Sequence, residues 1–323
     1  MSYRAPLALL LLSAAASPAA AEPVLSQPID CILGETCHIQ SYVDTDPSTA
    51  ARDFTCGTMT YDGHKGTDFA LPSLVALEKG VNVLAAADGV VRATRDGMDD
   101  RIMTAENEGD VEGRECGNGV VLTHPDGWET QYCHLKRGSI AVRSGTRVAS
   151  GAVLGQVGLS GRTQFPHVHL SVRRGDTVID PFAPEAAPDT CGTAPDRTLW
   201  QEAPPYRPGG LISAGFATTV PDYATVKAGQ AALPELAQDA PAIVFWAFAF
   251  GSQSGDTLDL RIIGPEGEVF AHRDTLDRTQ AQFFRAGGKR LRAALPPGLY
   301  TGEATLTRDG RALDTITAEI EAR

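Results

Sequence analysis

The stretch PHVHLSVRRGDTVID, residues 166–180, decides the fold of the region around it. An extended, valine-rich run ends at a Gly-Asp pair, which favours a turn, and a second extended run follows. This pattern predicts two short strands joined by a tight turn. Side chains two positions apart in a strand point to the same face, so we expect His167 and His169 on one side and Val168 on the other.

Two imidazoles on one face of a strand are costly to bury unless their ring nitrogens have partners. A bound metal ion would satisfy those nitrogens, whereas a pair of solvated surface histidines would need no such partner. The pair alone does not choose between these two interpretations. The choice depends on which other segments can reach the strand.

The surrounding sequence, from about residue 56 to 184, predicts an all-β domain. Short apolar runs alternate with Gly or Asp turns, and helical periodicity is weak throughout. The runs are VNVLAAADGVVRAT, GVVLTH, TQYCHL and TRVASGAVLGQVG. Residues 96–115 interrupt them with an acidic segment that lacks apolar alternation. We expect a solvated loop there, which either overhangs a site or is a surface insertion without a role.

Composition divides the whole chain into five parts. They are a signal peptide at 1–21, an irregular extension at 22–55, the β-rich domain at 56–184, a proline-rich linker at 185–209 and a second domain at 210–323. Strands and hairpin turns in the second domain predict a β-sandwich. Its segment TLDLRII alternates, so Leu258, Leu260 and Ile262 should share one face.

The N-terminus predicts export. Arg4 precedes the apolar run LALLLLSAAA, and small residues at 19–21 form a cleavage site. The run is shorter than the about 20 residues that span a bilayer, and no later segment is long and apolar enough. Six cysteines suit an oxidising compartment, so a periplasmic or secreted location is expected. The formal net charge of -12 argues against nucleic acid as a partner.

Six cysteines allow fifteen pairings, and the sequence leaves the choice open. Two of them are close enough in sequence to close a small loop. Two others flank a predicted hairpin, whose ends lie side by side within disulfide reach. These arguments, and the pair that they leave over, favour Cys31–Cys37, Cys116–Cys133 and Cys56–Cys191.

A second metal-ligand motif lies in GHKGTDF, residues 63–69. Its glycines argue against a helix, so His64 and Asp68 need not share a helical face as the histidines of HExxH do. A catalytic zinc ion takes three protein ligands and keeps a fourth position open for water. Three ligands are available if His64 and Asp68 are joined by one histidine of the HVH pair. The spacing does not show which of the two histidines it is. His134, at the end of an adjacent predicted strand, is a further candidate.

The segments GHKGTDF, YCHL followed by VRSGTRVASGAVLGQVGLSG, and FPHVHLSV ending at IDP resemble the LytM/lysostaphin-type zinc endopeptidases over about residues 56–182. Those enzymes cut peptide bonds in peptidoglycan stems and cross-links. The resemblance implies an antiparallel β-rich core of the duplicated hybrid motif type and one Zn²⁺ per chain. The ligands that it implies are His64, Asp68 and His169, and the residues acting on substrate and water are His134 and His167.

The expected activity is hydrolysis of peptidoglycan peptides by zinc-activated water. The alternative is a non-catalytic scaffold of the same fold that binds the cell wall or regulates another hydrolase, and the C-terminal domain is a candidate contact for a protein partner. Biotinyl and lipoyl carriers share the glycine-rich pattern of VLAAADGVV, but the export signal argues against them. Arg162 is either a contact for a substrate carboxylate or an ordinary loop residue, and Gln164 likewise. We expect His124 in solvent and no useful partner for His38 or His272.

Overall fold

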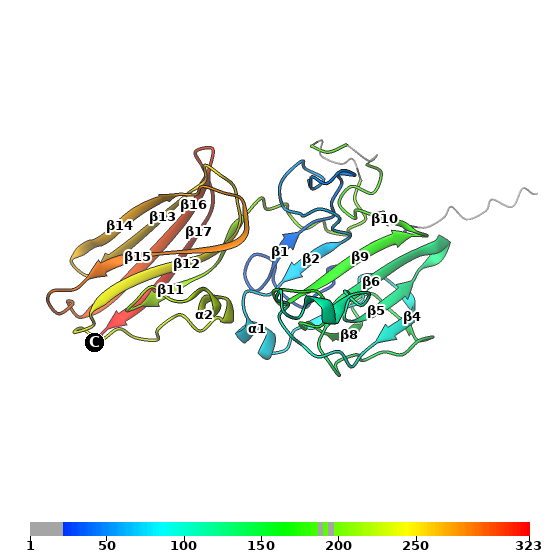
Figure 1. Ribbon diagram of the computed structural model, residues 1–323, viewed down its shortest axis with the longest axis horizontal. Coiled ribbons are helices and arrows are strands. Elements are labelled where there is room, and N and C mark those ends of the chain that lie inside the picture. The colour runs from blue at the N-terminus through cyan, green and yellow to red at the C-terminus, as the bar shows by residue number, and fades with distance from the viewer. Residues whose placement is uncertain (1–21, 187–189, 193–196) are drawn as a thin grey trace, which may run out of the picture.

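The computed structural model describes residues 22–186, 190–192 and 197–323, so the expected signal peptide at 1–21 lies outside it. The described chain forms two β-rich units, an N-terminal unit around one large sheet and a C-terminal sandwich of two smaller sheets (Figure 1). The predicted all-β, antiparallel fold class is confirmed. Among the described residues, no helix combines the length and apolar character needed to cross a bilayer.

The large sheet of the N-terminal unit has the strand order β1-β2-β9-β6-β5-β4-β7, with β10 paired to β9. Its strands are β1 (His38–Ser41), β2 (Thr67–Ala70), β4 (Gly89–Arg95), β5 (Asn118–Thr123), β6 (Trp128–Leu135), β7 (Arg147–Val148), β9 (His167–Arg174) and β10 (Thr177–Ile179). A separate pair is formed by β3 (Asn82–Leu84) and β8 (Val153–Gln156). The two HVH histidines therefore begin a central strand, with β2 on one side and β6 on the other.

Short helical turns connect the strands. They are α1 (Leu74–Glu78), η1 (Glu108–Val111), η2 (Pro125–Gly127) and α2 (Tyr223–Ala228). The turn η1 lies in the acidic segment 96–115, which we call the insertion loop and which contains no strand. The turn η2 closes the predicted β5–β6 hairpin through a Pro-Asp-Gly sequence, in which Asp126 has a positive φ of 57°.

The C-terminal unit is the predicted sandwich. A three-stranded sheet has the order β11-β12-β15, and a four-stranded sheet has the order β14-β13-β16-β17. Their bounds are β11 (Gly210–Ala217), β12 (Ala242–Ser252), β13 (Thr257–Gly264), β14 (Gly267–Thr275), β15 (Gln280–Arg290), β16 (Gly298–Arg308) and β17 (Arg311–Ala322). Leu258, Leu260 and Ile262 are buried on one face of β13, as their alternation predicts.

The segment 22–55 is more ordered than its irregular composition suggests. Within it, His38–Ser41 forms the buried strand β1, which pairs antiparallel with β2. The strand also contacts the sandwich, because the Gln40 side chain donates to the Ala281 carbonyl at 2.9 Å. The segment is therefore built into the N-terminal unit, and it joins that unit to β15.

The three disulfides are Cys31–Cys37, Cys56–Cys191 and Cys116–Cys133, which are the pairings that the sequence favours. The expectation for His124 is wrong, because it is buried: its Nδ1 lies 2.7 Å from the Asp88 carbonyl oxygen and its Nε2 lies 2.9 Å from Thr130 Oγ1. His38 is a core residue as well. Its ring is buried against Phe250, with a centroid distance of 4.5 Å. The rings of His38 and His124 are buried by residues that are distant in sequence, so local patterns do not predict their burial.

Candidate metal centre

Strand pairing brings the two metal-ligand motifs together. Strands β2 and β9 are antiparallel neighbours, in which Asp68 is paired with His169 and Ala70 with His167. Directly paired residues of antiparallel strands project from the same face, so Asp68 and His169 face each other across the ladder. His64 lies in the bend that leads into β2. Residues about a hundred positions apart in sequence therefore meet at one point.

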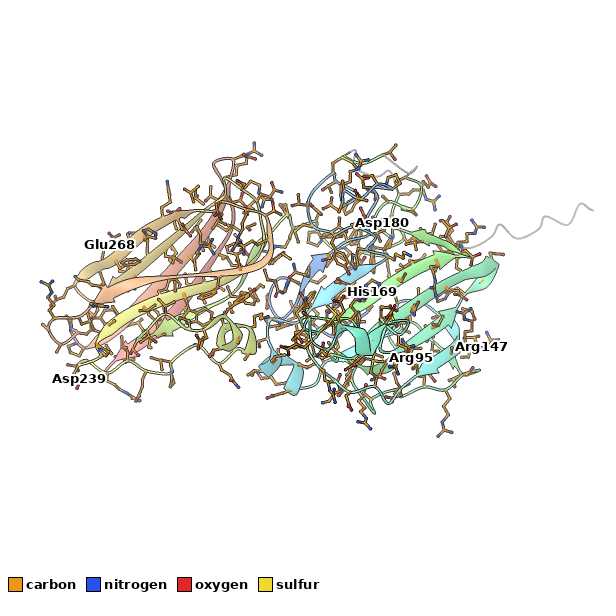
Figure 2. All side chains as sticks on the ribbon, viewed as in Figure 1. Arg95, Arg147, His169, Asp180, Asp239 and Glu268 are labelled. Carbon is orange, nitrogen blue, oxygen red and sulfur yellow. A yellow bond between two sulfur atoms is a disulfide. The ribbon has the colours of Figure 1, made fainter. Side chains whose placement is uncertain are left out.

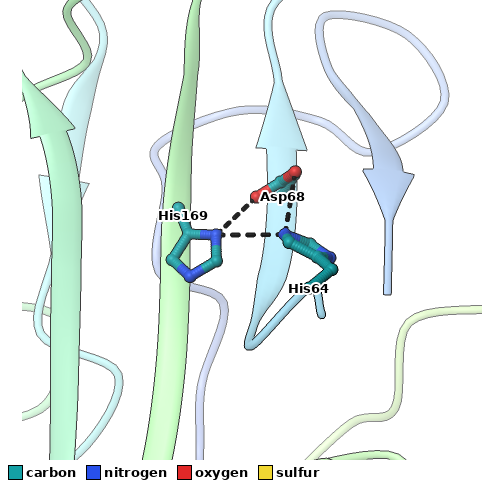
Figure 3. A group of neighbouring side chains, drawn as sticks. All are labelled: His64, Asp68 and His169. Atoms are coloured by element: carbon teal, nitrogen blue, oxygen red, sulfur yellow. Dashed lines mark hydrogen bonds and ion pairs between the residues drawn. The ribbon is translucent and has the colours of Figure 1, made fainter. Parts of the chain in front are cut away.

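His64, Asp68 and His169 form a compact triangle of potential ligand atoms (Figure 3). His64 Nε2 lies 3.2 Å from Asp68 Oδ2 and 3.2 Å from His169 Nδ1, and His169 Nδ1 lies 2.8 Å from Asp68 Oδ1. Tetrahedral zinc with bonds of about 2.0–2.1 Å requires ligand-to-ligand distances of roughly 3.3 Å. The donor set and its spacing therefore fit a zinc ion.

Contacts behind the triangle fix the orientation of its first histidine. His64 Nδ1 donates to the Tyr42 carbonyl oxygen at 2.6 Å, and Thr60 Oγ1 donates to the same oxygen at 2.7 Å. A ring that donates from Nδ1 presents the lone pair of Nε2 on its opposite side. Since His64 and Asp68 are both buried, the ligand atoms are held in place and shielded from bulk water.

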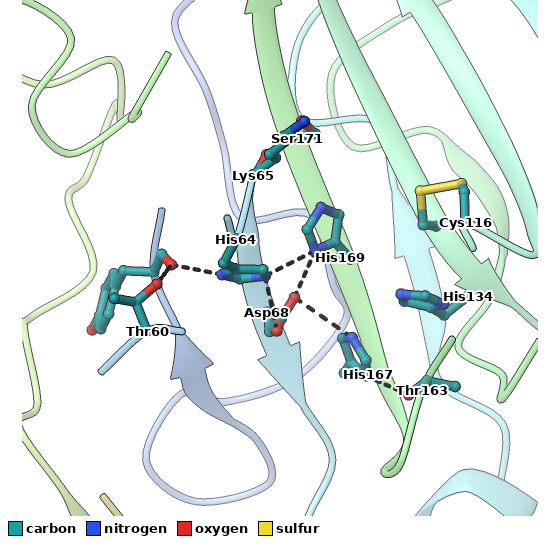
Figure 4. Close-up of polar contacts among 12 residues, drawn as sticks. Thr60, His64, Lys65, Asp68, Cys116, His134, Thr163, His167, His169 and Ser171 are labelled. Atoms are coloured by element: carbon teal, nitrogen blue, oxygen red, sulfur yellow. Dashed lines mark hydrogen bonds and ion pairs between the residues drawn. A yellow bond between two sulfur atoms is a disulfide. The ribbon is translucent and has the colours of Figure 1, made fainter. Parts of the chain in front are cut away.

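His134 and His167 lie beside the triangle, with ring centroids 4.6 Å apart (Figure 4). His167 Nδ1 donates to the Phe165 carbonyl at 2.9 Å, and its Nε2 lies 3.5 Å from Asp68 Oδ1. His134 Nδ1 donates to the Ser160 carbonyl at 2.8 Å. Each ring is thus anchored at Nδ1 and keeps Nε2 as the free nitrogen.

The backbone at His134 has an unusual conformation. Its φ is 64°, in the left-handed region that residues with a Cβ seldom adopt. The His134 N–H donates to the Cys116 carbonyl at 2.8 Å, and the His134 carbonyl accepts from Gly158 at 2.9 Å. Because of this kink, Cys133 and His134 line the same groove although they are consecutive in a strand. Such departures from regular φ and ψ are concentrated at functional sites.

Charges at the centre divide into an anionic ligand and two neutral bases. Burial favours a raised pKa for Asp68, but His64 and His167, with hydrogen bonds from His169 and His64, hold that pKa well below its usual range. Burial lowers the pKa of His134, and the neighbouring His167 and His169 lower it further. Burial also lowers the pKa of His167, against the opposing effect of Asp68. The arrangement pairs a carboxylate with two unprotonated imidazoles at neutral pH.

His64 behaves differently from these two bases. Burial acts to lower its pKa, but the charge and hydrogen bond of Asp68 and the Tyr42 carbonyl outweigh burial and raise it. A bound cation would replace the proton in this role, because it interacts favourably with the same carboxylate. The triangle therefore favours a positive charge at its centre.

The site opens into a groove of about 470 Å³. The groove is lined by His64, His134, His169 and the Cys116–Cys133 disulfide, among other residues. Tyr61 stands at its rim, 57% exposed, with its ring centroid 4.5 Å from that of His64. A chain-like ligand can thus reach His134 and His169 from solvent. All five residues implied by the sequence resemblance lie together in this region.

Sequence reasoning did not find the groups that orient these rings. The carbonyls of Tyr42, Ser160 and Phe165 act through the backbone, so their side chains carry no signal. Thr163 is an exception, because its hydroxyl lies 3.0 Å from His167 Nδ1. A hydroxyl four residues before a candidate catalytic histidine is a signal that could have been used.

Comparison with known proteins supports the same chemistry. Residues 62–181 match Peptidase family M23. The chain is 32% identical over 126 residues to the DD-carboxypeptidase/endopeptidase Mpg of Neisseria meningitidis serogroup B, which covers 38% of this chain and 23% of that protein. It is 34% identical over 109 residues to the peptidoglycan DD-endopeptidase ShyA of Vibrio cholerae, covering 34% of this chain and 20% of that protein. The chain thus spans less than a quarter of the length of either relative.

Solved structures resemble the chain more distantly. The catalytic domain of the prophage-encoded M23 protein EnpA from Enterococcus faecalis aligns with 22% identity and a TM-score of 0.34, covering 48% of this chain and 96% of that one. The catalytic domain of lysostaphin from Staphylococcus simulans aligns with 20% identity and a TM-score of 0.30, covering 44% and 85%. The family match covers the site itself, so residues 62–181 of this chain resemble a Peptidase family M23 domain in sequence.

Proposed function

We propose that this protein is an exported zinc endopeptidase that hydrolyses peptide bonds in the stems or cross-links of peptidoglycan. The observation that carries the proposal is the convergence of His64, Asp68 and His169 at distances that suit zinc. The M23 match and the endopeptidase names of the relatives support it. The three disulfides support an oxidising compartment, periplasmic or extracellular.

In this proposal His64 Nε2, Asp68 and His169 Nδ1 hold one zinc ion. When bound there, zinc lowers the pKa of water and polarises a peptide carbonyl. His64 and His169 line the groove, so an ion held by the triangle would lie beside the space that a peptide would enter. The anchoring of His64 by Tyr42 keeps the ligand nitrogen in place during turnover.

His134 and His167 act as the general acid and base beside the ligand triangle. Their lowered pKa values leave Nε2 unprotonated at neutral pH, so either ring can accept a proton from the attacking water. The proton is then returned to the amine that leaves. The ring that is protonated at that stage can also donate a hydrogen bond to the oxyanion of the tetrahedral carbon.

The alternative is a wall-binding or hydrolase-regulating scaffold of the same fold. A scaffold needs a surface for its partner, but it does not need two neutral imidazoles anchored at Nδ1 beside a buried His-Asp-His triangle. Five such side chains, four of them in a buried environment, are costly to maintain without a catalytic role. The geometry therefore favours the enzyme.

Digestion of purified sacculi tests the proposal. We expect the zinc-loaded protein to release peptide fragments whose masses identify the bond cut, a chelator to stop the release and added zinc to restore it. His169→Ala should be inactive, whereas His272→Ala, which changes an exposed histidine on β14 of the sandwich, should match wild type. Failure of the zinc-loaded wild type to release any fragment would contradict the proposal.

A further inference from the structure

The insertion loop is fixed to a segment that contacts both His134 and His167. That segment, residues 159–163, supplies the Ser160 carbonyl to His134 and the Thr163 hydroxyl to His167. The insertion loop binds it through its backbone: Met103 N–H donates to the Thr163 carbonyl at 2.7 Å. The loop is therefore part of the groove wall and is less free than its acidic, non-alternating sequence suggests.

Further contacts connect the insertion loop to residues 159–162 of the same segment. Arg162 N–H donates to the Glu115 carbonyl at 2.8 Å, and the Asp100 carboxylate accepts from Leu159 N–H at 2.7 Å. Gly161 packs so closely on the loop that a Cβ there would lie 2.2 Å from the Glu115 carbonyl oxygen. These contacts fix the backbone from which the Arg162 side chain extends.

The Arg162 side chain lines the groove together with His134 and His169. Among the described residues it forms one ion pair, with Glu108 of the insertion loop, from Nη2 to Oε1 at 3.4 Å. The two side chains are 47% and 49% exposed. A single long contact between half-exposed groups contributes little to stability. A bidentate carboxylate would interact more strongly with the same guanidinium.

The groove is more basic than the protein as a whole. Its charged side chains, histidines apart, are Lys65, Arg162, Arg173 and Glu115. Among the described residues Lys65 has no ion pair, and Arg173 has only a 3.4 Å contact with Glu129. Three cations and one anion line this groove in a chain whose formal net charge is -12. Such a local excess of positive charge favours an anionic ligand.

We propose that Arg162 binds a carboxylate of the substrate and that Glu108 is the internal counterion which this carboxylate displaces. The preferred substrate is then a peptide with a free carboxylate near the scissile bond, and the insertion loop is a specificity element. This inference rests on the proposed function, because it names the substrate class of the same groove. It assigns a role to a loop that the catalytic chemistry does not use.

Two matched substrates test the inference without any mutation. They are cross-linked peptidoglycan peptides that differ only in whether the carboxyl groups near the scissile bond are free acids or primary amides. For the zinc-loaded wild type we expect kcat/KM to be about tenfold or more higher on the acid peptide, which is the usual size of one hydrogen-bonded charge contact. Equal kcat/KM values on the two peptides would overturn the inference.

Variants test whether the preference for the acid peptide depends on Arg162 and Glu108. Arg162→Gln should raise KM on the acid peptide about tenfold and leave the amide peptide nearly unchanged, while Arg162→Lys keeps the charge and part of the preference. Glu108→Gln should lower KM on the acid peptide a few-fold, since it frees the guanidinium. The control is Arg147→Gln, an exposed arginine on β7 at the far edge of the sheet from His169 (Figure 2). An acid preference in Arg162→Gln equal to that of Arg147→Gln would overturn the inference.

Failure of the proposed function has a different signature. If the zinc-loaded wild type cleaves neither peptide, binding can still be measured by calorimetry. The affinities of the acid and amide peptides are then compared for wild type and for Arg162→Gln. Stronger binding of the acid peptide that Arg162→Gln abolishes would support the carboxylate site in a protein that is not a peptidase. Equal binding of both peptides would reject the site. If Arg162→Gln does not fold, Arg162→Lys and Glu108→Gln carry the same comparison.

Discussion

Gly66 lies directly against the imidazole of His169, so that a Cβ on Gly66 would come within 2.5 Å of His169 Nε2 and within 2.5 Å of the Leu170 carbonyl oxygen. The carbonyl belongs to the backbone of β9 and cannot swing aside. The glycine that separates His64 from Asp68 in GHKGTDF is thus what allows the two ligand-bearing segments to approach.

Replacement of this glycine should weaken zinc binding. Gly66→Ala pushes His169 or β2 out of place, and we expect the zinc affinity to fall about 10–100-fold, the range for changes that misplace a ligand. Competition with a fluorescent chelator measures it. Gly109→Ala is the matched control, since a Cβ there meets nothing within 4 Å. Equal affinities in the two variants would show that the contact with His169 does not matter.

His134→Ala should separate proton transfer from metal binding. The ring is not part of the ligand triangle, so the zinc content should stay near that of wild type. Peptide hydrolysis should fall about 10²–10⁴-fold, the usual contribution of a general acid–base. Metal analysis and kcat on the same preparation check both parts. Loss of zinc together with activity would instead make His134 a ligand.

The Cys116–Cys133 disulfide should matter for catalysis as well as stability. It lines the groove, and the Cys116 carbonyl accepts from the His134 N–H at 2.8 Å. Cys116→Ser/Cys133→Ser should lower the free energy of unfolding by about 3 kcal/mol and lower kcat more than it raises KM. Urea unfolding and steady-state kinetics test this. Unchanged kcat in a folded, zinc-loaded variant would contradict a positioning role.

The pH dependence of stability should reflect His38. Burial lowers its pKa from 6.5 to about 4, partly offset by the hydrogen bond with Gln40. The unfolded chain therefore binds a proton that the folded chain excludes, and stability falls as the pH drops from 6.5 towards 4. The shift corresponds to roughly 3 kcal/mol.

His38→Gln removes this titration. Its stability should change less than that of wild type between pH 6.5 and 4, although lost packing on Phe250 lowers its stability at every pH. The slope of unfolding free energy against pH, measured in urea, is therefore the informative quantity. Parallel slopes for the two proteins would rule out His38 as the group responsible.

Local patterns predicted the parts of the fold that depend on local geometry. The period of two placed His167 and His169 on one face of β9, and it placed Leu258 and Leu260 in the core of the sandwich. The Pro-Asp-Gly turn predicted the β5–β6 hairpin and, through it, a disulfide. These features follow from neighbouring residues alone.

Other features depend on contacts between distant segments. The strand β1, with the sequence HIQS, is polar and is buried only because β2 and the sandwich cover it. The insertion loop holds segment 159–163 largely through backbone groups, which no side-chain pattern reveals. The left-handed conformation of His134 is accompanied by backbone hydrogen bonds to Cys116 and Gly158. None of these has a signature within a short window of sequence.

The zinc content of the purified chain shows whether the His64–Asp68–His169 triangle binds a metal ion. Wild type and His272→Ala, measured by elemental mass spectrometry after dialysis against zinc-free buffer, should each retain about one zinc ion per chain. His169→Ala and His64→Ala should retain almost none, because each removes one corner of the triangle with Asp68. If His169→Ala holds as much zinc as wild type, the metal is bound elsewhere and the account of this site is wrong.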